Sequence, residues 1–196
     1  RGEGYNADPN NTYYRARYYV RVPDNASLSP LVSGAKAALS LSGWFNTAIS
    51  NGTIIHKGDG GNSQEYRVFI EGNALKFTVW NHYGSPETVT LNYSLSRGQW
   101  YFFHASAERV GNSDNMRLNI RLYSGASDNP LATNDLQTRI SQDNKNTSGR
   151  LYIGAVSYGG EPTSYFDGWL DEIRVYQGLR ANAQIIADKN ASRVCS

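Results

Sequence analysis

The chain has 196 residues, a formal net charge of +2 and 18% charged residues, and its lysines and arginines are scattered along it. Because binding to nucleic acid or to an anionic membrane needs a basic stripe or patch, this composition disfavours both. No apolar run is long enough to span a membrane, and the length fits one all-β domain with its own core.

The two ends of the chain are polar. Residues 1–16 predict a surface segment that leads into a single domain over 1–196, and residues 188–196 predict a C-terminal tail. The lone Cys195 either pairs with a cysteine of the parent protein outside this chain or has no role. With Arg1 first and no signal peptide, we interpret the chain as a fragment of a longer extracellular or cell-surface protein.

Short runs of alternating apolar and polar residues, separated by turn residues, predict a series of strands. In the first half they cover 18–22, 38–45, 53–57, 66–70 and 75–80. The last two flank Glu71-Gly72-Asn73, which predicts a hairpin turn of three or four residues.

The second half continues the pattern, with predicted strands at 88–93, 100–107, 116–123, 150–153 and 169–176. Helical spacing occurs only in 182–190, where Ile185 and Ile186 lie on one side. Many short strands without interleaved helices predict an all-β fold, a jelly-roll sandwich of two antiparallel sheets with a short C-terminal helix.

A family resemblance rests on the run 166–176, Phe-Asp-Gly-Trp-Leu-Asp-Glu-Ile-Arg-Val-Tyr. It closely resembles the motif that closes bacterial laminin G-like domains of the concanavalin A-like lectin/glucanase superfamily. Matches to other segments of that family follow in the same order, at Lys57-Gly58, Gly98-Gln99-Trp100, His104-Ala105 and 151–154. Residues 13–19 depart from it, because they lack the Asp-Gly bend that the family often has there.

The carboxylates argue against catalysis on this scaffold. Retaining glycoside hydrolases need two carboxylates about 5–5.5 Å apart. The only acid-dense strand holds Asp171 and Glu172, and neighbours in a strand point to opposite faces. The acid array of jelly-roll glucanases and the catalytic set of jelly-roll lyases are both absent from the sequence. We therefore expect a non-enzyme, with a glycan-active enzyme as the least favoured alternative.

The histidines do not have the spacing of metal ligands. His56 and His104 lie inside predicted strands and are interpreted as structural, whereas His82 lies in a loop where it can contact a ligand.

Carbohydrate binding needs aromatic faces for stacking and planar polar groups for sugar hydroxyls. Predicted loops supply both, and the candidate ligand-binding residues are Trp80, Asn81, His82, Tyr83, Asp59, Asn62, Tyr158 and Tyr165. The other three tryptophans, Trp44, Trp100 and Trp169, lie in alternating strands and are predicted to be core residues.

Calcium is the one cofactor that the residues leave open. Ca²⁺ prefers about six to eight oxygen ligands, and many concanavalin A-like sandwiches carry such an ion. Candidate ligands are Asp171, Asp59 and Asp114, and ordinary turn chemistry is the alternative explanation for the two loop residues.

The first hypothesis is therefore a carbohydrate-binding or adhesion module of a larger extracellular bacterial protein, such as a pilus-associated adhesin. Its partner would be a glycan or a host or cell-surface polysaccharide. The alternative is a protein-interaction or spacer module without sugar affinity, because the same scaffold carries both functions.

Overall fold

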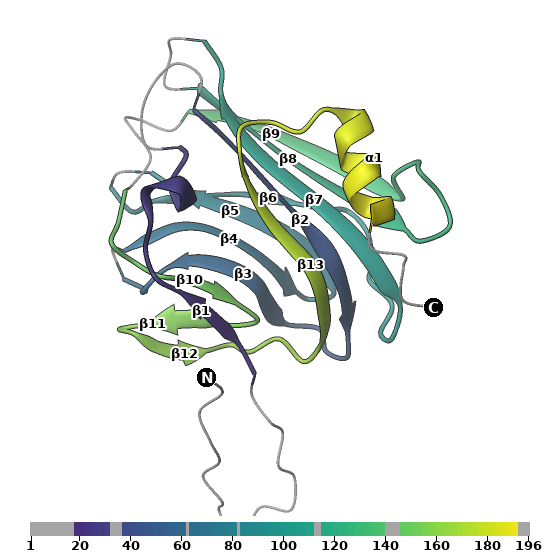
Figure 1. Cartoon of the computed structure of the whole chain (residues 1–196), viewed down its shortest axis with the longest axis horizontal. Helices are drawn as coiled ribbons and strands as arrows, with labels where there is room; N and C mark the ends of the chain where they lie inside the picture. Colours follow the sequence, from purple (N-terminus) through teal and green to yellow (C-terminus); the bar gives the residue numbers. More distant parts are fainter. Residues whose placement is uncertain are drawn as a thin grey trace, which may run out of the picture.

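The structure is a computed structural model that describes residues 18–31, 37–61, 63–81, 83–111, 115–139 and 146–191. Two large antiparallel sheets face each other, as Figure 1 shows. This arrangement confirms the predicted two-sheet sandwich. No helix among the described residues is long and apolar enough to cross a membrane.

Sheet A has six strands in the order β1-β10-β3-β4-β5-β6. Their bounds in chain order are β1 Val20–Val22, β3 Gly52–Gly58, β4 Gln64–Glu71, β5 Ala74–Trp80, β6 Pro86–Thr90 and β10 Leu151–Ile153. A separate two-stranded hairpin, β11 Val156–Tyr158 and β12 Glu161–Thr163, follows β10.

Sheet B has five strands in the order β13-β2-β7-β8-β9. Their bounds in chain order are β2 Ala38–Thr47, β7 Trp100–Arg109, β8 Asn115–Ser124, β9 Ala132–Arg139 and β13 Gly168–Gln177. Two short helices complete the fold, the 3-10 helix η1 Ala26–Leu28 and the α-helix α1 Asn182–Ala191.

The core lies between the sheets because the inward residues of each strand are apolar. Sheet B contributes Leu39, Leu41 and Phe45 from β2, and sheet A contributes Phe77 and Val79 from β5, all fully buried. The period of two that predicted these strands places the polar residues between them on the outer faces.

The turn between β4 and β5 is shorter than predicted. Glu71 pairs with Ala74, so the turn has two residues, Gly72 and Asn73. Their φ angles of 61° and 64° are those of a type I′ turn, whose twist matches that of the flanking strands.

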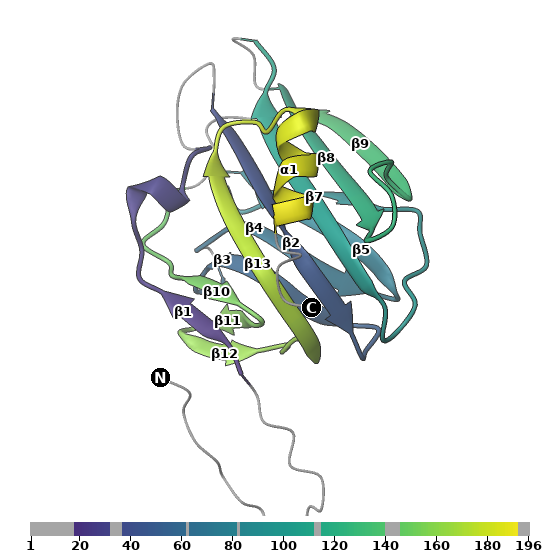
Figure 2. The same cartoon turned by 45° about the vertical axis from the view of Figure 1, so that its right-hand side comes forward.

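Helix α1 lies over part of the outer face of sheet B (Figure 2). Ile185 forms a second buried cluster with Trp44, Phe102 and Tyr123, and Ile186 packs against it. The indole Nε1 of Trp44 donates a hydrogen bond to the carbonyl of Lys189, at 3.3 Å. The predicted helix is therefore confirmed, and it extends into the predicted tail as far as Ala191.

The outer face of sheet A is also covered in part, by the β11–β12 hairpin. The hairpin contacts β3 and β10, while β4, β5 and β6 form the other half of the sheet. This asymmetry determines where the candidate site can lie.

Candidate functional site

A row of side chains crosses the outer face of sheet A. Strand register aligns Tyr152 of β10, His56 of β3, Arg67 of β4, Thr78 of β5 and Thr88 of β6. Neighbouring positions in such a row are about 5 Å apart. The row therefore leads from the half of the face under the hairpin to the half formed by β4, β5 and β6.

The hairpin buries the first half of this row. His56 and Tyr152 are fully buried, and the amide of Ser157 on β11 donates to Nδ1 of His56 at 3.4 Å. Burial, with a smaller contribution from the charge of Arg67, lowers the pKa of His56 to about 3. His56 is therefore a neutral structural residue at ordinary pH.

Asp59 and Tyr158, two of the predicted ligand-binding residues, meet at the tip of this hairpin. The amide of Gly159 donates to the carbonyl of Asp59 at 2.7 Å. Gly60 allows this approach, because a Cβ atom there would lie 2.7 Å from Cα of Tyr158 and its φ is 83°. The Tyr158 side chain remains 53% exposed.

The carboxylate of Asp59 is fixed by two residues, Tyr152 in β10 and Arg150 just before it. The hydroxyl of Tyr152 donates to Oδ1 at 2.8 Å, and Nη1 of Arg150 lies 3.4 Å from Oδ2. These bonds hold the Asp59 carboxylate in a defined orientation beside Tyr158, where its remaining lone pairs can accept from a ligand hydroxyl.

Arg67 borders the hairpin on the open side and was not among the predicted residues. Its guanidinium lies 4.3 Å from the centre of the Phe69 ring, and both Nε and Nη2 donate to Oγ1 of Thr53, at 3.0 and 2.6 Å. Burial lowers the pKa of Arg67, while nearby Tyr158 and Glu71 act in the opposite direction. We call Asp59, Arg67, Phe69 and Tyr158 the hairpin site.

The loop after β5 contributes less than predicted. Trp80 is only 9% exposed and stands edge-on to the His56 ring, with centroids 6.4 Å apart. Asn81 is buried, and its Oδ1 accepts from the amide of Ser85 at 2.9 Å, as in a structural turn. Tyr83 is 63% exposed. Of the three predicted loop residues that the structure describes, Tyr83 is the one that is widely exposed.

Several predicted positions cannot be placed in this way. His82, Asn62, Asp114 and Cys195, like the segment 1–16, lie outside the described residues. Tyr165 is described, but its hydroxyl donates to the carbonyl of Pro162 at 2.8 Å and its ring lies 6.2 Å from that of Tyr19. Tyr165 thus supports the hairpin that carries Tyr158.

The metal candidates are separated by the fold. Asp59 lies at the hairpin on sheet A, whereas Asp171 is an exposed residue of β13 in sheet B. Within the described ranges, no group of three or more His, Cys, Asp or Glu side chains could hold a metal ion. Calcium binding therefore stays a prediction.

A buried lysine holds the end of β3 from which the Asp59 loop starts. The fully buried ammonium of Lys57 donates to Oδ1 of Asp24 at 2.8 Å, to Oε1 of Glu65 at 3.1 Å and to the carbonyl of Gly149. The same Oε1 of Glu65 accepts from the amide and the hydroxyl of Thr147, at 2.9 and 2.8 Å. One charge thus joins four segments of the chain.

Two of the three tryptophans predicted for the core are exposed, so that prediction was wrong for them. Trp44 is buried, although beneath α1 rather than between the sheets. Trp169 is 70% exposed and Trp100 is 42% exposed, and both pair in register with Asn46 of β2. The alternation of the two strands could have predicted this exposure. Leu170 and Tyr101, which follow Trp169 and Trp100, point into the core, so the tryptophans point outward.

A bulge lies at the acidic pair of β13. A β-bulge interrupts the register after Asp171, and Glu172 takes a φ of 51°. Both side chains are exposed, and the Glu172 carboxylate pairs with the Arg174 guanidinium. Because both carboxylates are exposed at the bulge, neither incurs the desolvation cost of burial in a strand.

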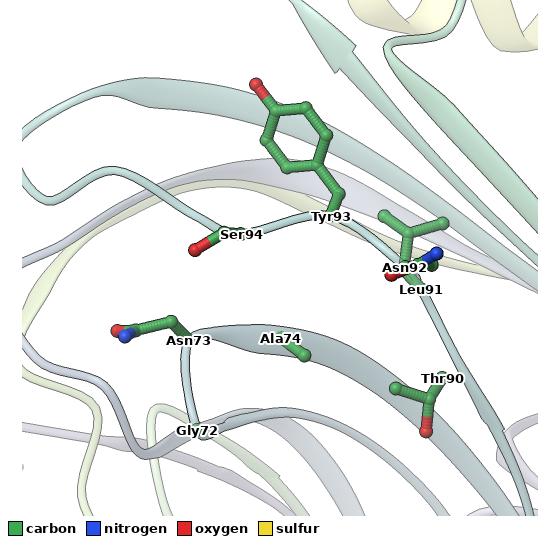
Figure 3. Close-up of a pocket in the computed structure, with 8 residues that line it drawn as sticks. All are labelled: Gly72, Asn73, Ala74, Thr90, Leu91, Asn92, Tyr93 and Ser94. Atoms are coloured by element: carbon green, nitrogen blue, oxygen red, sulfur yellow. The ribbon is translucent and has the colours of Figure 1, made fainter.

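A shallow pocket of about 300 Å³ lies elsewhere on the molecule. Its lining contains no charged side chain and consists of Gly72, Asn73, Ala74, Thr90, Leu91, Asn92, Tyr93 and Ser94 (Figure 3). The Tyr93 ring points away from Thr90 and Ala74 and stands edge-on to Tyr101, with centroids 6.1 Å apart. The ring of Tyr93, the aromatic residue of the lining, is therefore not placed to stack on a ligand in the pocket.

Comparison with known proteins places these features in a family context. A laminin G-type family model, described as the concanavalin A-like lectin/glucanases superfamily, matches residues 17–186. No curated protein sequence matches the chain.

Solved structures share the fold at low sequence identity. A heptameric SAP-like pentraxin from Limulus polyphemus is 14% identical with a TM-score of 0.55, over 93% of this chain and 80% of that chain. The CBM40 of Ruminococcus gnavus IT-sialidase bound to alpha2,3 sialyllactose is 15% identical with a TM-score of 0.56, over 84% and 86%.

The LG1-3 region of the laminin alpha2 chain gives a similar result. It is 14% identical with a TM-score of 0.56, over 85% of this chain and 31% of that chain. These likenesses show a shared fold, and one of the matched structures, the CBM40, is a complex with a glycan.

Proposed function

Because the chain belongs to the concanavalin A-like lectin/glucanase superfamily, we propose that it is a non-catalytic carbohydrate-binding domain whose ligand contacts the hairpin site. Fold alone does not assign this function, since the same sandwich carries others. The proposal therefore depends on the side chains of the site.

One observation carries the proposal: the exposed Tyr158 stands at the tip of the hairpin, where the backbone of that tip contacts the Asp59 loop. The Asp59 carboxylate is held by Tyr152 and Arg150, and the Arg67 guanidinium, in the neighbouring row, is held by Thr53. An aromatic face stacks on the apolar face of a sugar ring, while carboxylate and guanidinium groups bind its hydroxyls. Held by the fold, these groups lose little conformational entropy on binding.

We place the domain outside the cell, as an adhesion module of a larger bacterial surface protein such as a pilus-associated adhesin. The sialyllactose bound to the CBM40 of the same fold supports a glycan partner. Calcium, with Asp59 or Asp171 as a ligand, belongs to the same proposal.

A glycan array tests the proposal, with the intact chain screened in calcium and again in chelator. We expect binding that Tyr158→Ala reduces about tenfold or more, because the stacking ring is lost. Tyr18→Ala is the matched control, since Tyr18 is exposed at 76% next to β1. Binding that is lost only in chelator would support a calcium ion at the site. Equal binding by wild type and Tyr158→Ala would exclude the hairpin site.

A protein-interaction function is the second candidate, favoured by the exposed pair Trp100 and Trp169. Large exposed aromatic side chains are typical of protein interfaces. A blank array in both conditions would refute carbohydrate binding and leave this candidate in its place.

A further inference from the structure

The guanidinium of Arg67 has one occupied edge and one open edge. Arginine presents two pairs of parallel N–H groups, one formed by Nε and Nη2 and the other by the two terminal nitrogens. Oγ1 of Thr53 accepts from the Nε and Nη2 edge, and Phe69 supports the plane from one side. Arg67 makes no further hydrogen bond with the residues that the structure describes.

Two acidic groups of this region, Glu71, which influences Arg67, and Asp59 of the hairpin site, are engaged by other cations. Asp59 lies 3.4 Å from Arg150, and Glu71 lies 2.6 Å from Lys76. His56, the next residue of the row, is neutral. Arg67 itself forms no ion pair within the described part of the chain, although it is half-buried. A partly desolvated charge without a counterion is costly, and it favours binding of an anion.

The geometry points to a carboxylate. A terminal pair of parallel N–H groups matches the two oxygens of a carboxylate in a bidentate arrangement. Tyr158 follows Ser157, whose amide binds His56, the cross-strand neighbour of Arg67, so a sugar ring stacked on Tyr158 can bring a substituent toward Arg67.

We propose that Arg67 makes the hairpin site selective for acidic glycans, whose sugar carboxylate binds the open edge of its guanidinium. The inference rests on the proposed carbohydrate-binding function and names the ligand class of the same site. Selectivity arises because a neutral sugar leaves the half-buried charge of Arg67 without a counterion.

The test compares each acidic glycan with its neutral counterpart. The probes are oligogalacturonate and its methyl ester, sialyllactose and lactose, and a sulfated lactose, each titrated by calorimetry against the 196-residue chain. We expect at least one carboxylate glycan to bind about ten- to a hundredfold more tightly than its neutral counterpart. Arg67→Gln should weaken binding of the acidic glycan about tenfold or more relative to its neutral counterpart, and so abolish that difference.

Two variants control for charge and for geometry. Arg117→Gln removes a positive charge from the surface of sheet B, where Arg117 pairs with Glu108, and should leave the preference intact. Arg67→Lys keeps the charge but loses the parallel N–H pair, so an intermediate loss is expected. If Arg67→Gln fails to fold, the test compares Arg67→Lys with wild type in the ratio of acidic to neutral glycan affinity.

The outcomes separate the two proposals. Neutral glycans that bind as tightly as acidic ones, and lose affinity in Tyr158→Ala, would refute the inference and leave the proposed function standing. A preference that persists in Arg67→Gln, or a sulfated lactose that binds as tightly as the carboxylates, would also refute it. A failure of every glycan to bind would overturn both.

Discussion

Replacing Lys57 by methionine removes the ammonium group that joins four segments at the end of β3. Methionine has a similar length, so the change mainly deletes the charge and its hydrogen bonds. Asp24 and Glu65 would then face each other without the cation that lies 2.8 and 3.1 Å from them. The carbonyl of Gly149 would also lose its donor.

The expected loss follows from the burial of this group. Lys57 is fully buried and Glu65 almost so, and removing one partner of a buried ion pair costs about 3–5 kcal/mol. For a chain of this length, such a loss lowers the melting temperature by roughly 6–20 °C. The double variant Lys57→Met/Glu65→Gln should recover about 1–3 kcal/mol, because glutamine stays neutral and its oxygen can still accept from Thr147.

Urea unfolding followed by tryptophan fluorescence measures these values. Lys76→Met is the matched control, because Lys76 pairs with Glu71 at the surface and its loss should cost at most about 1 kcal/mol. A Lys57→Met variant as stable as Lys76→Met would refute the reasoning, as would a double variant no more stable than Lys57→Met alone.

Two further predictions concern pH and the hairpin. Burial lowers the pKa of His56 to about 3 and that of His104 to about 4, from 6.5, so the unfolded state binds more protons between these values. The free energy of unfolding should therefore fall as the pH decreases from about 6.5 to 4, by up to about 1.4 kcal/mol per pH unit for each histidine. Urea unfolding at a series of pH values measures this dependence, and it should be weaker in His104→Asn. Gly60→Ala should weaken glycan binding, because its Cβ would displace Tyr158. Gly61→Ala is the control, since a Cβ there meets no atom within 4 Å and strains only its own backbone. Equal affinities of the two variants in calorimetry would contradict a role for the contact between Gly60 and Tyr158.

The elements that face the core could be predicted from the sequence because one face of each is apolar. The alternation around Leu39 and Leu41 predicted β2, and Ile185 predicted the packing side of α1. Strand β9 was missed because it is an edge strand with mostly exposed polar residues, and β11 and β12 because three residues show no period. The predicted strand at 88–93 begins two residues earlier, at Pro86.

The candidate site was harder to predict because it depends on register between distant strands. Asp59 and Tyr158 were identified from loop chemistry, but Arg67 lies within a strand and gains its role from Thr53 and the hairpin tip. Trp80, which looked like a loop ligand, is buried against His56, a contact that no local pattern reveals.

The bulge in β13 has a consequence for association between molecules. β13 is an edge strand of sheet B, and a regular strand of this length would offer unpaired amides and carbonyls to another chain. The left-handed backbone at Glu172 interrupts that row, and the exposed carboxylates of Asp171 and Glu172 repel an incoming acidic edge. Restoring a regular strand by deleting Glu172 would therefore promote edge-to-edge aggregation, which makes this bulge a safeguard for solubility at high protein concentration.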